Sequence, residues 1–316
     1  MAERKWVNTL KPGTDIEETF VVRTRDLRQR RGSGNYLAVT LGDRTGEVMA
    51  LAWENVEHLA KICEPGSVIL IGGQVQRYQG RTQVVVRRAE AIDPQVVDAG
   101  LYVRASSVDP AILWQKLQAF IGDVKEQNLK QLLFRIFSDP EVKRLFRVAP
   151  AAKTMHHAFR SGLLEHTVSA AAAARLLAEH YGLHQDLVVA GVMLHDLGKI
   201  WELGGKNSIE YTDDGRLLGH IAIEVLYVDR QIGELKEFPA ELRRQLLHIL
   251  LAHHGEYEYG SPRRPKTPEA MLVHSIDNLD ARLAGMFEAI EADGETDEPW
   301  SGYSKMLERN VYRRRL

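Results

Sequence analysis

The chain has 316 residues, 44% of them hydrophobic, and this length with this apolar content favours two globular domains over one. Its 41 basic and 43 acidic residues give a formal net charge of −2, so contact with nucleic acid requires local basic clusters rather than a uniformly positive surface. The single cysteine, Cys63, excludes an internal disulfide and a cysteine-rich zinc module, and it favours a reducing compartment.

The N-terminal stretch MAERKWVNTLKPG lacks the apolar core of a signal peptide. Farther along the chain, no apolar run approaches the ~20 residues that are needed to span a bilayer. We therefore expect a cytoplasmic protein that has no membrane role.

Between about residues 16 and 92 the chain contains five β-rich runs separated by turn signals: DIEETFVVRTRD, NYLAVTLGD, GEVMALAWE, GSVILIGGQVQRYQ and GRTQVVVRRAEAI. In the second run Leu37, Val39 and Leu41 alternate with other residues, as in a sheet with one face inward. The segment ENVEHLAKI after the third run is typical of a short helix. Five strands with a helix after the third is the layout of an OB-fold, so we predict an all-β OB-fold barrel that binds nucleic acid over residues 1–100.

An OB-fold binds single strands through its second and third strands and through loops one-two and four-five, and here both loops are basic. The candidate contacts are arginines of these loops and aromatic side chains that can stack on bases: Arg28, Arg30, Arg31, Tyr36, Trp53, Tyr78 and Arg81. Taken singly, each arginine could be a solvated loop residue and each aromatic could fill the barrel. Arginines in both loops together favour a single-strand interface.

After residue 100 the hydrophobic period becomes helical and remains so. Asp109 and Pro110 suit the start of a helix. We predict a helical connector over residues 101–150, an all-α helical bundle over residues 151–295 and a tail over residues 296–316. The predicted fold class is therefore multidomain, with an all-β barrel followed by an all-α bundle.

Histidines and aspartates stand at scattered points inside or at the edges of these apolar helices. They are His166 in GLLEHT, His195 and Asp196 in LHDLGK, His220 in LLGHIA, His253 and His254 in LAHHGE, and Asp277 in HSIDNLD. A lone histidine or aspartate there is more often a satisfied polar group. Several together favour a metal centre, because a helical bundle can bring ligands from different helices to one cavity.

This ordered set resembles the HD superfamily of metal-dependent phosphohydrolases, which is named for the adjacent His-Asp pair. The resemblance implies one metal ion held by the first histidine, the signature pair and the final aspartate, here His166, His195, Asp196 and Asp277. It also implies that His220 and one or both of His253 and His254 match the extra histidines of two-metal members, in which the signature aspartate bridges the ions. Adjacent helical residues point about 100° apart, so we expect His253 to bind metal and His254 to contact another metal or the substrate.

Nitrogen and oxygen ligands without sulfur suit an octahedral divalent ion better than a structural zinc site. We expect Mn²⁺, as one or two ions, while Fe²⁺, Co²⁺ or Ni²⁺ would suit the same ligands. Two such ions can activate a water molecule and stabilise the opposing oxygens of an in-line attack on phosphorus, which is phosphoester hydrolysis with Asp196 as a catalytic residue. Lys199 could return toward the site across one helical turn and neutralise a phosphate oxygen, as its equivalent often does in HD enzymes, or it could be an exposed surface lysine.

The stretch APAAKTMHHAFRSGLLEHT leads into the bundle, and with the OB-fold it resembles the YhaM family of bacterial 3′-to-5′ exoribonucleases over nearly the whole chain. The resemblance implies manganese-dependent release of nucleotides from the 3′ end of RNA, often also of single-stranded DNA, by a homo-oligomer. His156, His157 and Arg160 are candidate substrate contacts at the rim of the site, although helix-end structure explains them nearly as well. One departure is Ser161-Gly162, where many relatives have a glycine pair, and we expect no effect on the chemistry.

Two other functions fit parts of the sequence. HD domains also hydrolyse small nucleotides such as cyclic nucleotides, deoxynucleoside triphosphates and alarmones, and the metal ligands do not distinguish these substrates from a polymer. The barrel favours a polymer, because a small nucleotide needs no extended groove. A non-catalytic single-strand-binding adaptor would have a purely structural bundle, which the complete set from His166 to Asp277 disfavours.

Overall fold

The computed structural model describes residues 4–30, 34–78, 80–93, 98–102, 108–152, 159–204, 209–291, 298–304 and 307–314. The chain divides after Ala105 into two compact units, the first built of strands and the second of helices. Three predicted substrate contacts, Arg31, His156 and His157, lie outside the described residues. Within the described ranges, no helix is both long enough and apolar enough to cross a membrane.

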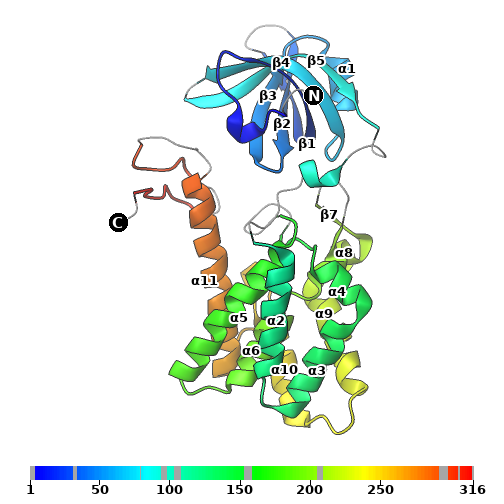
Figure 1. Cartoon of the computed structure of the whole chain (residues 1–316), viewed down its shortest axis with the longest axis vertical. Helices are drawn as coiled ribbons and strands as arrows, with labels where there is room; N and C mark the ends of the chain where they lie inside the picture. Colours follow the sequence, from blue (N-terminus) through cyan, green and yellow to red (C-terminus); the bar gives the residue numbers. More distant parts are fainter. Residues whose placement is uncertain are drawn as a thin grey trace. The chain divides into compact units, whose positions relative to one another are not determined.

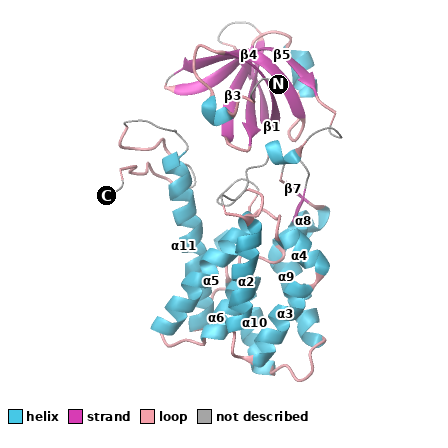
Figure 2. Cartoon of the chain, in the orientation of Figure 1, coloured by secondary structure: helices cyan, strands magenta, loops and turns pink. Residues whose placement is uncertain are grey.

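The first unit is a closed five-stranded barrel (Figure 2). Its strands are β1 (Asp15–Gln29), β2 (Asn35–Asp43), β3 (Gly46–Ala52), β4 (Val68–Tyr78) and β5 (Arg81–Ala91). They pair in the order β1-β2-β3-β5-β4, and β1 closes the barrel against β4. Only the β3–β5 pairing is parallel among the described barrel strands. Helix α1 (Val56–Ile62) connects β3 to β4, so the predicted OB-fold is confirmed.

The predicted alternation in β2 is confirmed on its inner face. Leu37, Val39 and Leu41 are buried in the barrel core. The other face of the strand is less exposed than the alternation suggests, because Ala38 and Gly42 are buried as well. A Cβ atom at Gly42 would lie 2.6 Å from Arg23 Nε, so the Arg23 side chain covers this part of the outer face.

The second unit is a helical bundle (Figure 1). Its helices are α2 (Pro110–Asp123), α3 (Gln127–Ser138), α4 (Pro140–Phe146), α5 (Gly162–His180), α6 (Gln185–Leu194), α7 (Lys199–Glu202), α8 (Asp213–Leu217), α9 (Gly219–Gly233), α10 (Ala240–Ala252) and α11 (Pro268–Glu291). The short elements of the chain are β6 (Leu203–Gly204), β7 (Glu210–Tyr211) and the 3₁₀ turns η1 (Val7–Thr9), η2 (Ala99–Leu101) and η3 (Tyr257–Tyr259). Helix α5 packs against α2, α6 and α11, and one hydrophobic core extends through the bundle.

The start of the helical unit follows from its sequence. Asp109 Oδ1 accepts a hydrogen bond from Ala111 N at 2.7 Å, and Pro110 occupies the first turn of α2, so the predicted helix start is confirmed. Helices α2, α3 and α4 contribute to the same core as the later helices. The domain boundaries predicted at residues 100, 150 and 295 stay predictions.

Two glycines allow close helix contacts around the turn that joins α6 to α7. A Cβ atom at Gly191 would lie 2.7 Å from Ile249 Cγ2, and one at Gly198 would lie 2.1 Å from the backbone oxygen of His220. Only glycine permits both approaches without displacing the neighbouring chain. The turn with His195 and Asp196 is therefore held against α9 and α10.

Candidate metal centre and nucleic-acid interface

Four of the predicted ligands converge at one point of the helical unit. We call them cluster A: His166, His195, Asp196 and Asp277. The Nε2 atoms of His166 and His195 are 3.2 Å apart, and they lie 3.4 and 3.5 Å from Asp277 Oδ1. Asp196 Oδ2 is 3.8 Å from Nε2 of His166 and 3.4 Å from Nε2 of His195. Helices α5 and α11 and the turn after α6 thus bring four donor atoms together.

Three further histidines form a second group, which we call cluster B: His220, His253 and His254. Asp196 Oδ1 is 3.7 Å from His220 Nε2 and 3.8 Å from His253 Nε2, whereas its Oδ2 atom faces cluster A. One carboxylate therefore faces both clusters. His253 is fully buried, and His254 is partly exposed at the edge of the group.

Hydrogen bonds on the outer side of two rings determine which nitrogen faces the clusters. His195 and His253 are the C-cap residues of α6 and α10. Nδ1 of each ring donates to the carbonyl three residues earlier, to Val192 O at 2.7 Å and to Leu250 O at 2.8 Å. Because a carbonyl only accepts, both rings have their proton on Nδ1 and present the lone pair of Nε2 to the clusters. This is the tautomer that binds a metal through Nε2.

The donor atoms have the chemistry of a metal site. Two neighbouring atoms that bind one divalent ion at about 2.1 Å lie roughly 3.0 to 3.4 Å apart, which is close to the spacings within cluster A. Among the buried polar atoms that have no hydrogen-bond partner in the described part of the chain, three belong to residues of the clusters: Asp196 Oδ1, His220 Nε2 and His253 Nε2. An unpaired buried polar group costs about 1–3 kcal/mol. Divalent ions bound by these residues would offset that cost.

The electrostatics of cluster A favour positive charge. Burial alone would lower the pKa of His166, but hydrogen bonds with Asp277 and Asp280 outweigh burial and raise this pKa to about 10. Burial would raise the pKa of Asp277, but His166 and His195 hold it well below its ordinary value. In cluster B, burial and then the neighbouring His195 lower the pKa of His253 well below its ordinary value. Cluster A therefore attracts a cation, while His253 stays neutral and free to bind a metal.

The barrel carries an aromatic and basic surface where β1 leads into β2. The rings of Tyr36 and Trp53 stack with centroids 4.7 Å apart and planes at 24°. The Arg30 guanidinium lies 5.2 Å from the centre of the Trp53 ring and donates to Trp53 O. Arg28 pairs with Tyr36 across β1 and β2 and forms an ion pair with Asp26 at 2.9 Å. Four predicted contacts are thus brought together, and Trp53 remains 41% exposed.

Two other predicted contacts, Tyr78 and Arg81, lie on a different hairpin. They are directly paired at the ends of β4 and β5. Tyr78 is exposed, so its ring is accessible to a base. The predicted interface therefore consists of two separate sets of side chains.

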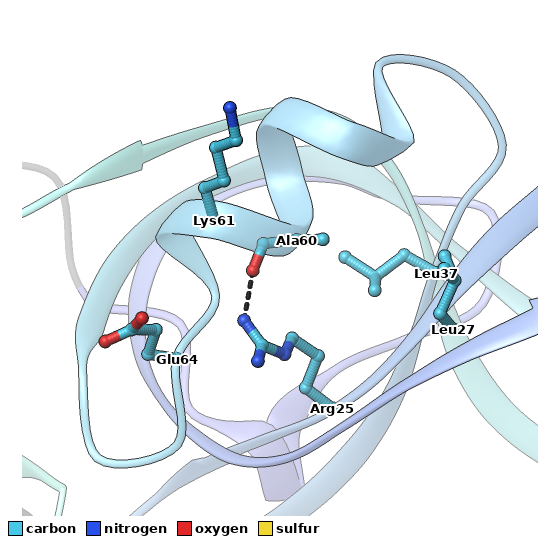
Figure 3. Close-up of a pocket in the computed structure, with 6 residues that line it drawn as sticks. All are labelled: Arg25, Leu27, Leu37, Ala60, Lys61 and Glu64. Carbon is cyan, nitrogen blue, oxygen red and sulfur yellow. Dashed lines mark hydrogen bonds between the residues drawn. The ribbon is translucent and has the colours of Figure 1, made fainter.

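The barrel unit has a hollow of about 410 Å³. The residues that line it, drawn in Figure 3, are Arg25, Leu27, Leu37, Ala60, Lys61 and Glu64. Leu27 and Leu37 are directly paired across β1 and β2, so their side chains share one face of the sheet. The next pair along the strands, Arg28 with Tyr36, points to the opposite face. The hollow is therefore not part of the aromatic surface.

Comparison with known proteins identifies the family of each unit and a relative that spans both units. A family model described as an HD domain matches residues 163–282, and one described as an OB-fold nucleic acid binding domain matches residues 19–92. The 3′-5′ exoribonuclease YhaM of Bacillus subtilis (strain 168) is 32% identical over 281 residues, which cover 88% of this chain and 88% of that protein. The chain belongs to the YhaM family. The HD match includes every residue of clusters A and B.

Solved structures resemble the separate parts of this YhaM-family chain. The second OB-fold domain of replication protein A from Methanococcus maripaludis is 15% identical, with a TM-score of 0.24, and covers 30% of this chain and 100% of its own. The HD domain of the phosphodiesterase PgpH from L. monocytogenes is 20% identical, with a TM-score of 0.32, and covers 49% of this chain and 81% of its own.

In this YhaM-family site, Lys199 is not an exposed surface lysine. Its Nζ atom donates to Asp196 Oδ2 at 2.8 Å, and its side chain is 14% exposed. Burial would lower the pKa of Lys199, but Asp196 and Asp277 outweigh it and raise this pKa. A fixed cation therefore lies beside cluster A, while its contact with a phosphate stays a prediction. Arg160 is exposed, and its contact with substrate stays a prediction as well.

Ser161 has a backbone conformation that favours glycine. Its φ is +68°, and it directly precedes α5. A left-handed conformation costs a non-glycine residue about 1–2 kcal/mol. Here the buried serine hydroxyl donates to Arg147 O at 2.7 Å, and its backbone N donates to Val148 O at 3.2 Å. These hydrogen bonds offset part of the strain at the residue that precedes the helix carrying His166.

Two carboxylates that sequence reasoning missed contact ligands of the clusters. Asp280 Oδ2 accepts from His166 Nδ1 at 2.7 Å. Glu202 Oε1 accepts from the backbone N of His220 at 3.0 Å and lies 3.2 Å from its Nδ1 atom. A carboxylate on the outer nitrogen fixes the ring orientation and raises the basicity of Nε2. Each cluster therefore has one histidine supported in this way.

A third missed carboxylate, Glu224, is fully buried beneath cluster B. Its Oε1 atom is 3.7 Å from His253 Nδ1, and Oε2 accepts a hydrogen bond of 3.4 Å from Gly198 N. Burial, and then the nearby Asp196, raise the pKa of Glu224 well above its ordinary value. The only signal in the sequence was helical spacing, since Glu224 follows His220 by one turn of α9.

We predict that Asp280→Ala weakens binding of Mn²⁺ by about 10- to 100-fold, because His166 loses the acceptor that orients its ring. Calorimetric titration of the metal-free protein with Mn²⁺ measures the change. Asp280→Asn retains a hydrogen-bond acceptor and should bind more tightly than Asp280→Ala. Ser169→Ala is the matched control, because Ser169 donates to the other oxygen of Asp280 at 2.6 Å. Equal affinities for Asp280→Ala and the control would exclude this role for Asp280.

Proposed function

We propose that this protein is a metal-dependent 3′-to-5′ exonuclease that hydrolyses phosphodiester bonds of single-stranded RNA, and also of single-stranded DNA. The observation that carries the proposal is the position of Asp196, whose two oxygens face two groups of ligand atoms in a YhaM-family chain. This arrangement suits phosphodiester hydrolysis better than a purely structural bundle. It argues against the non-catalytic adaptor.

The donor set supports a particular kind of ion. Clusters A and B offer imidazole nitrogens and carboxylate oxygens, so we propose Mn²⁺ as the ion, in one or two copies, with Fe²⁺, Co²⁺ or Ni²⁺ able to replace it. Divalent ions bound there would acidify a water molecule and stabilise charge on the phosphodiester oxygens. The sequence contains a single cysteine, which suits the reducing cytoplasm as the place of action.

The fixed side chains then have separate tasks. Lys199 is a largely buried cation held by Asp196, and we propose that it contacts a non-bridging phosphate oxygen. His254 is the member of cluster B at the solvent edge, where it can contact the substrate or complete the ligand set. Arg160, together with His156 and His157, is proposed to contact the strand at the rim.

In this proposal the barrel holds the strand through bases and phosphates. Tyr36 and Trp53 offer a stacked aromatic surface, and Arg30 adds a cation beside it. Such binding tolerates any base sequence and weakens as salt increases. A polymeric substrate explains why an OB-fold accompanies an HD domain in one chain. The assembly of several copies into a homo-oligomer remains part of the proposal.

The decisive experiment is digestion of a 5′-labelled single-stranded RNA in the presence of Mn²⁺, beside a copy with a blocked 3′ end. A ladder of products that shortens from the free 3′ end, and its absence from the blocked copy, would support the proposed function. Intact RNA would contradict the proposal, and the small nucleotides would then be tested as substrates in the same buffer.

For the barrel, we predict that Trp53→Ala weakens binding of a long single strand by about 5- to 100-fold, because stacking on one aromatic ring contributes about 1–3 kcal/mol per base. Fluorescence anisotropy of a labelled oligonucleotide measures the effect. Cleavage of a dinucleotide should change much less. Met49→Ala replaces another partly exposed apolar side chain of the barrel and is the control. If the affinity depends on strand length in the same way in Trp53→Ala and in Met49→Ala, the barrel does not take part in strand binding.

A further inference from the structure

A tyrosine-containing loop follows cluster B directly. Residues 255–266 lie in the connection between α10 and α11, and we call this segment loop 255–266. Tyr257 and Tyr259 are 56% and 63% exposed, although they follow the partly buried His254 by only a few residues. Nothing in the metal chemistry requires these two rings. Their position beside the site therefore calls for a separate explanation.

The loop is attached to cluster B by a hydrogen bond. His254 Nδ1 donates to the backbone oxygen of Tyr259 at 2.8 Å, which leaves the Nε2 atom of His254 for cluster B. The loop also returns to α10, because Arg263 N donates to Leu251 O at 3.1 Å. These two hydrogen bonds hold the loop in place without a ligand. Its side chains therefore form a preorganised rim next to the solvent-exposed edge of the site.

The exposed side chains of the loop have the chemistry that binds a single strand. The Arg264 guanidinium lies 5.1 Å from the centre of the Tyr257 ring and forms an ion pair with Glu256 at 2.7 Å. Arg263 and Lys266 are exposed and add positive charge. Aromatic rings and guanidinium planes stack on bases of any sequence, and cations attract the phosphates between them.

The two tyrosines offer separate stacking faces. They are two residues apart in a 3₁₀ turn, which has three residues per turn, so their side chains point about 120° apart. One ring cannot cover the other in this geometry. Each can therefore contact a different base, or contact a base and the adjacent sugar.

We propose that loop 255–266 is a nucleobase-binding subsite of the helical unit, in which Tyr257, Tyr259 and Arg264 hold the bases next to the phosphodiester that is cleaved. The occupant is the 3′-terminal part of a single-stranded nucleic acid, because the loop is continuous with cluster B and combines stacking rings with cations. This inference rests on the proposed exonuclease function and adds to it a second strand-binding site, distinct from the barrel.

The test compares Tyr257→Ala, Tyr259→Ala and the double variant with the wild-type protein on a short oligonucleotide and on a small chromogenic phosphodiester without a base. Both side-chain deletions leave the Tyr259 carbonyl that binds His254 in place. We expect the KM for the oligonucleotide to increase by about 5- to 100-fold in the double variant, while kcat changes far less. The KM for the small phosphodiester should change much less than the KM for the oligonucleotide. Phenylalanine at both positions should restore binding, because it retains the stacking ring.

Tyr181→Ala is the matched control, since Tyr181 is 64% exposed and lies at the C-terminal end of α5. Its KM for the oligonucleotide should equal that of the wild type, and Mn²⁺ content should be equal in all variants. If the wild type degrades RNA and the double variant behaves like Tyr181→Ala, this inference fails while the proposed function stands. Equal losses on both substrates together with lost metal would show a structural effect and would also reject the inference. If the wild type leaves RNA intact, the proposed function itself fails.

Discussion

Asp196→Asn is expected to reduce phosphodiester hydrolysis by at least about 10³-fold, while the barrel still binds single strands. The reason is that one side chain serves both clusters, with Oδ2 facing His166 and His195 and Oδ1 facing His220 and His253. An amide of the same shape has no negative charge and offers only one oxygen. Cleavage rates on labelled RNA and anisotropy measured on the same strand report the two properties separately.

The matched control for this variant is Asp229→Asn, which removes a carboxylate of α9 that pairs with Arg243 at 2.7 Å. This surface ion pair contributes little to stability, so the control should cleave RNA at the wild-type rate. Undiminished cleavage by Asp196→Asn would reject the assignment of the two clusters as the catalytic metal centre. Loss of binding together with cleavage would instead indicate that the substitution unfolds the protein.

Binding of Mn²⁺ to the metal-free protein is expected to strengthen about tenfold for each pH unit between roughly 7 and 9, with release of about one proton per ion bound at cluster A. The cause is His166, whose pKa Asp277 and Asp280 raise to about 10 against the opposing effect of burial. The metal binds only the neutral ring, so protons compete with it until the pH exceeds about 10. Calorimetric titrations in two buffers with different ionisation enthalpies measure affinity and proton release together.

The same raised pKa determines how metal-free stability depends on pH. A histidine whose pKa is raised on folding contributes stability that is complete below its unfolded pKa of about 6.5 and is lost as the pH rises toward about 10. The metal-free protein should therefore unfold more easily at pH 9 than at pH 7, and saturating Mn²⁺ should reduce this difference. His180→Gln changes an exposed histidine of α5, and the stability of this metal-free variant should depend on pH as that of the wild type does. A metal affinity independent of pH would contradict the proton competition.

The local features of the fold were predictable because they depend on neighbouring residues. The alternation of Leu37, Val39 and Leu41 and the capping sequence at Asp109 both led to the observed elements. The covered outer face at Gly42 was not predictable, because it results from the Arg23 side chain of another strand. Sequence patterns report which face of a strand is apolar, and they do not report what else packs on the polar face.

The candidate site was predictable to the extent that its residues stand in recognisable sequence contexts. All six expected metal ligands lie in clusters A and B together with His254, and their roles as ligands stay a proposal. The question of whether His253 or His254 is nearer to Asp196 needed coordinates, and the structure brings His253 Nε2 to 3.8 Å from Asp196 Oδ1. Asp280 was missed because its partner, His166, is 114 residues away in the sequence. Contacts over such distances are set by helix packing and leave no local pattern.

The repeated use of C-cap histidines has an electrostatic consequence. His195 and His253 end α6 and α10, so two helices direct their carbonyl ends toward the same pair of clusters. The aligned peptide dipoles of a helix place about half a negative charge at such an end, which stabilises a nearby cation by about 0.3–1 kcal/mol. This attraction comes from the backbone and survives any single side-chain substitution. A variant that lacks one ligand should therefore still concentrate divalent cations weakly at this point, so the backbone itself is part of the binding site.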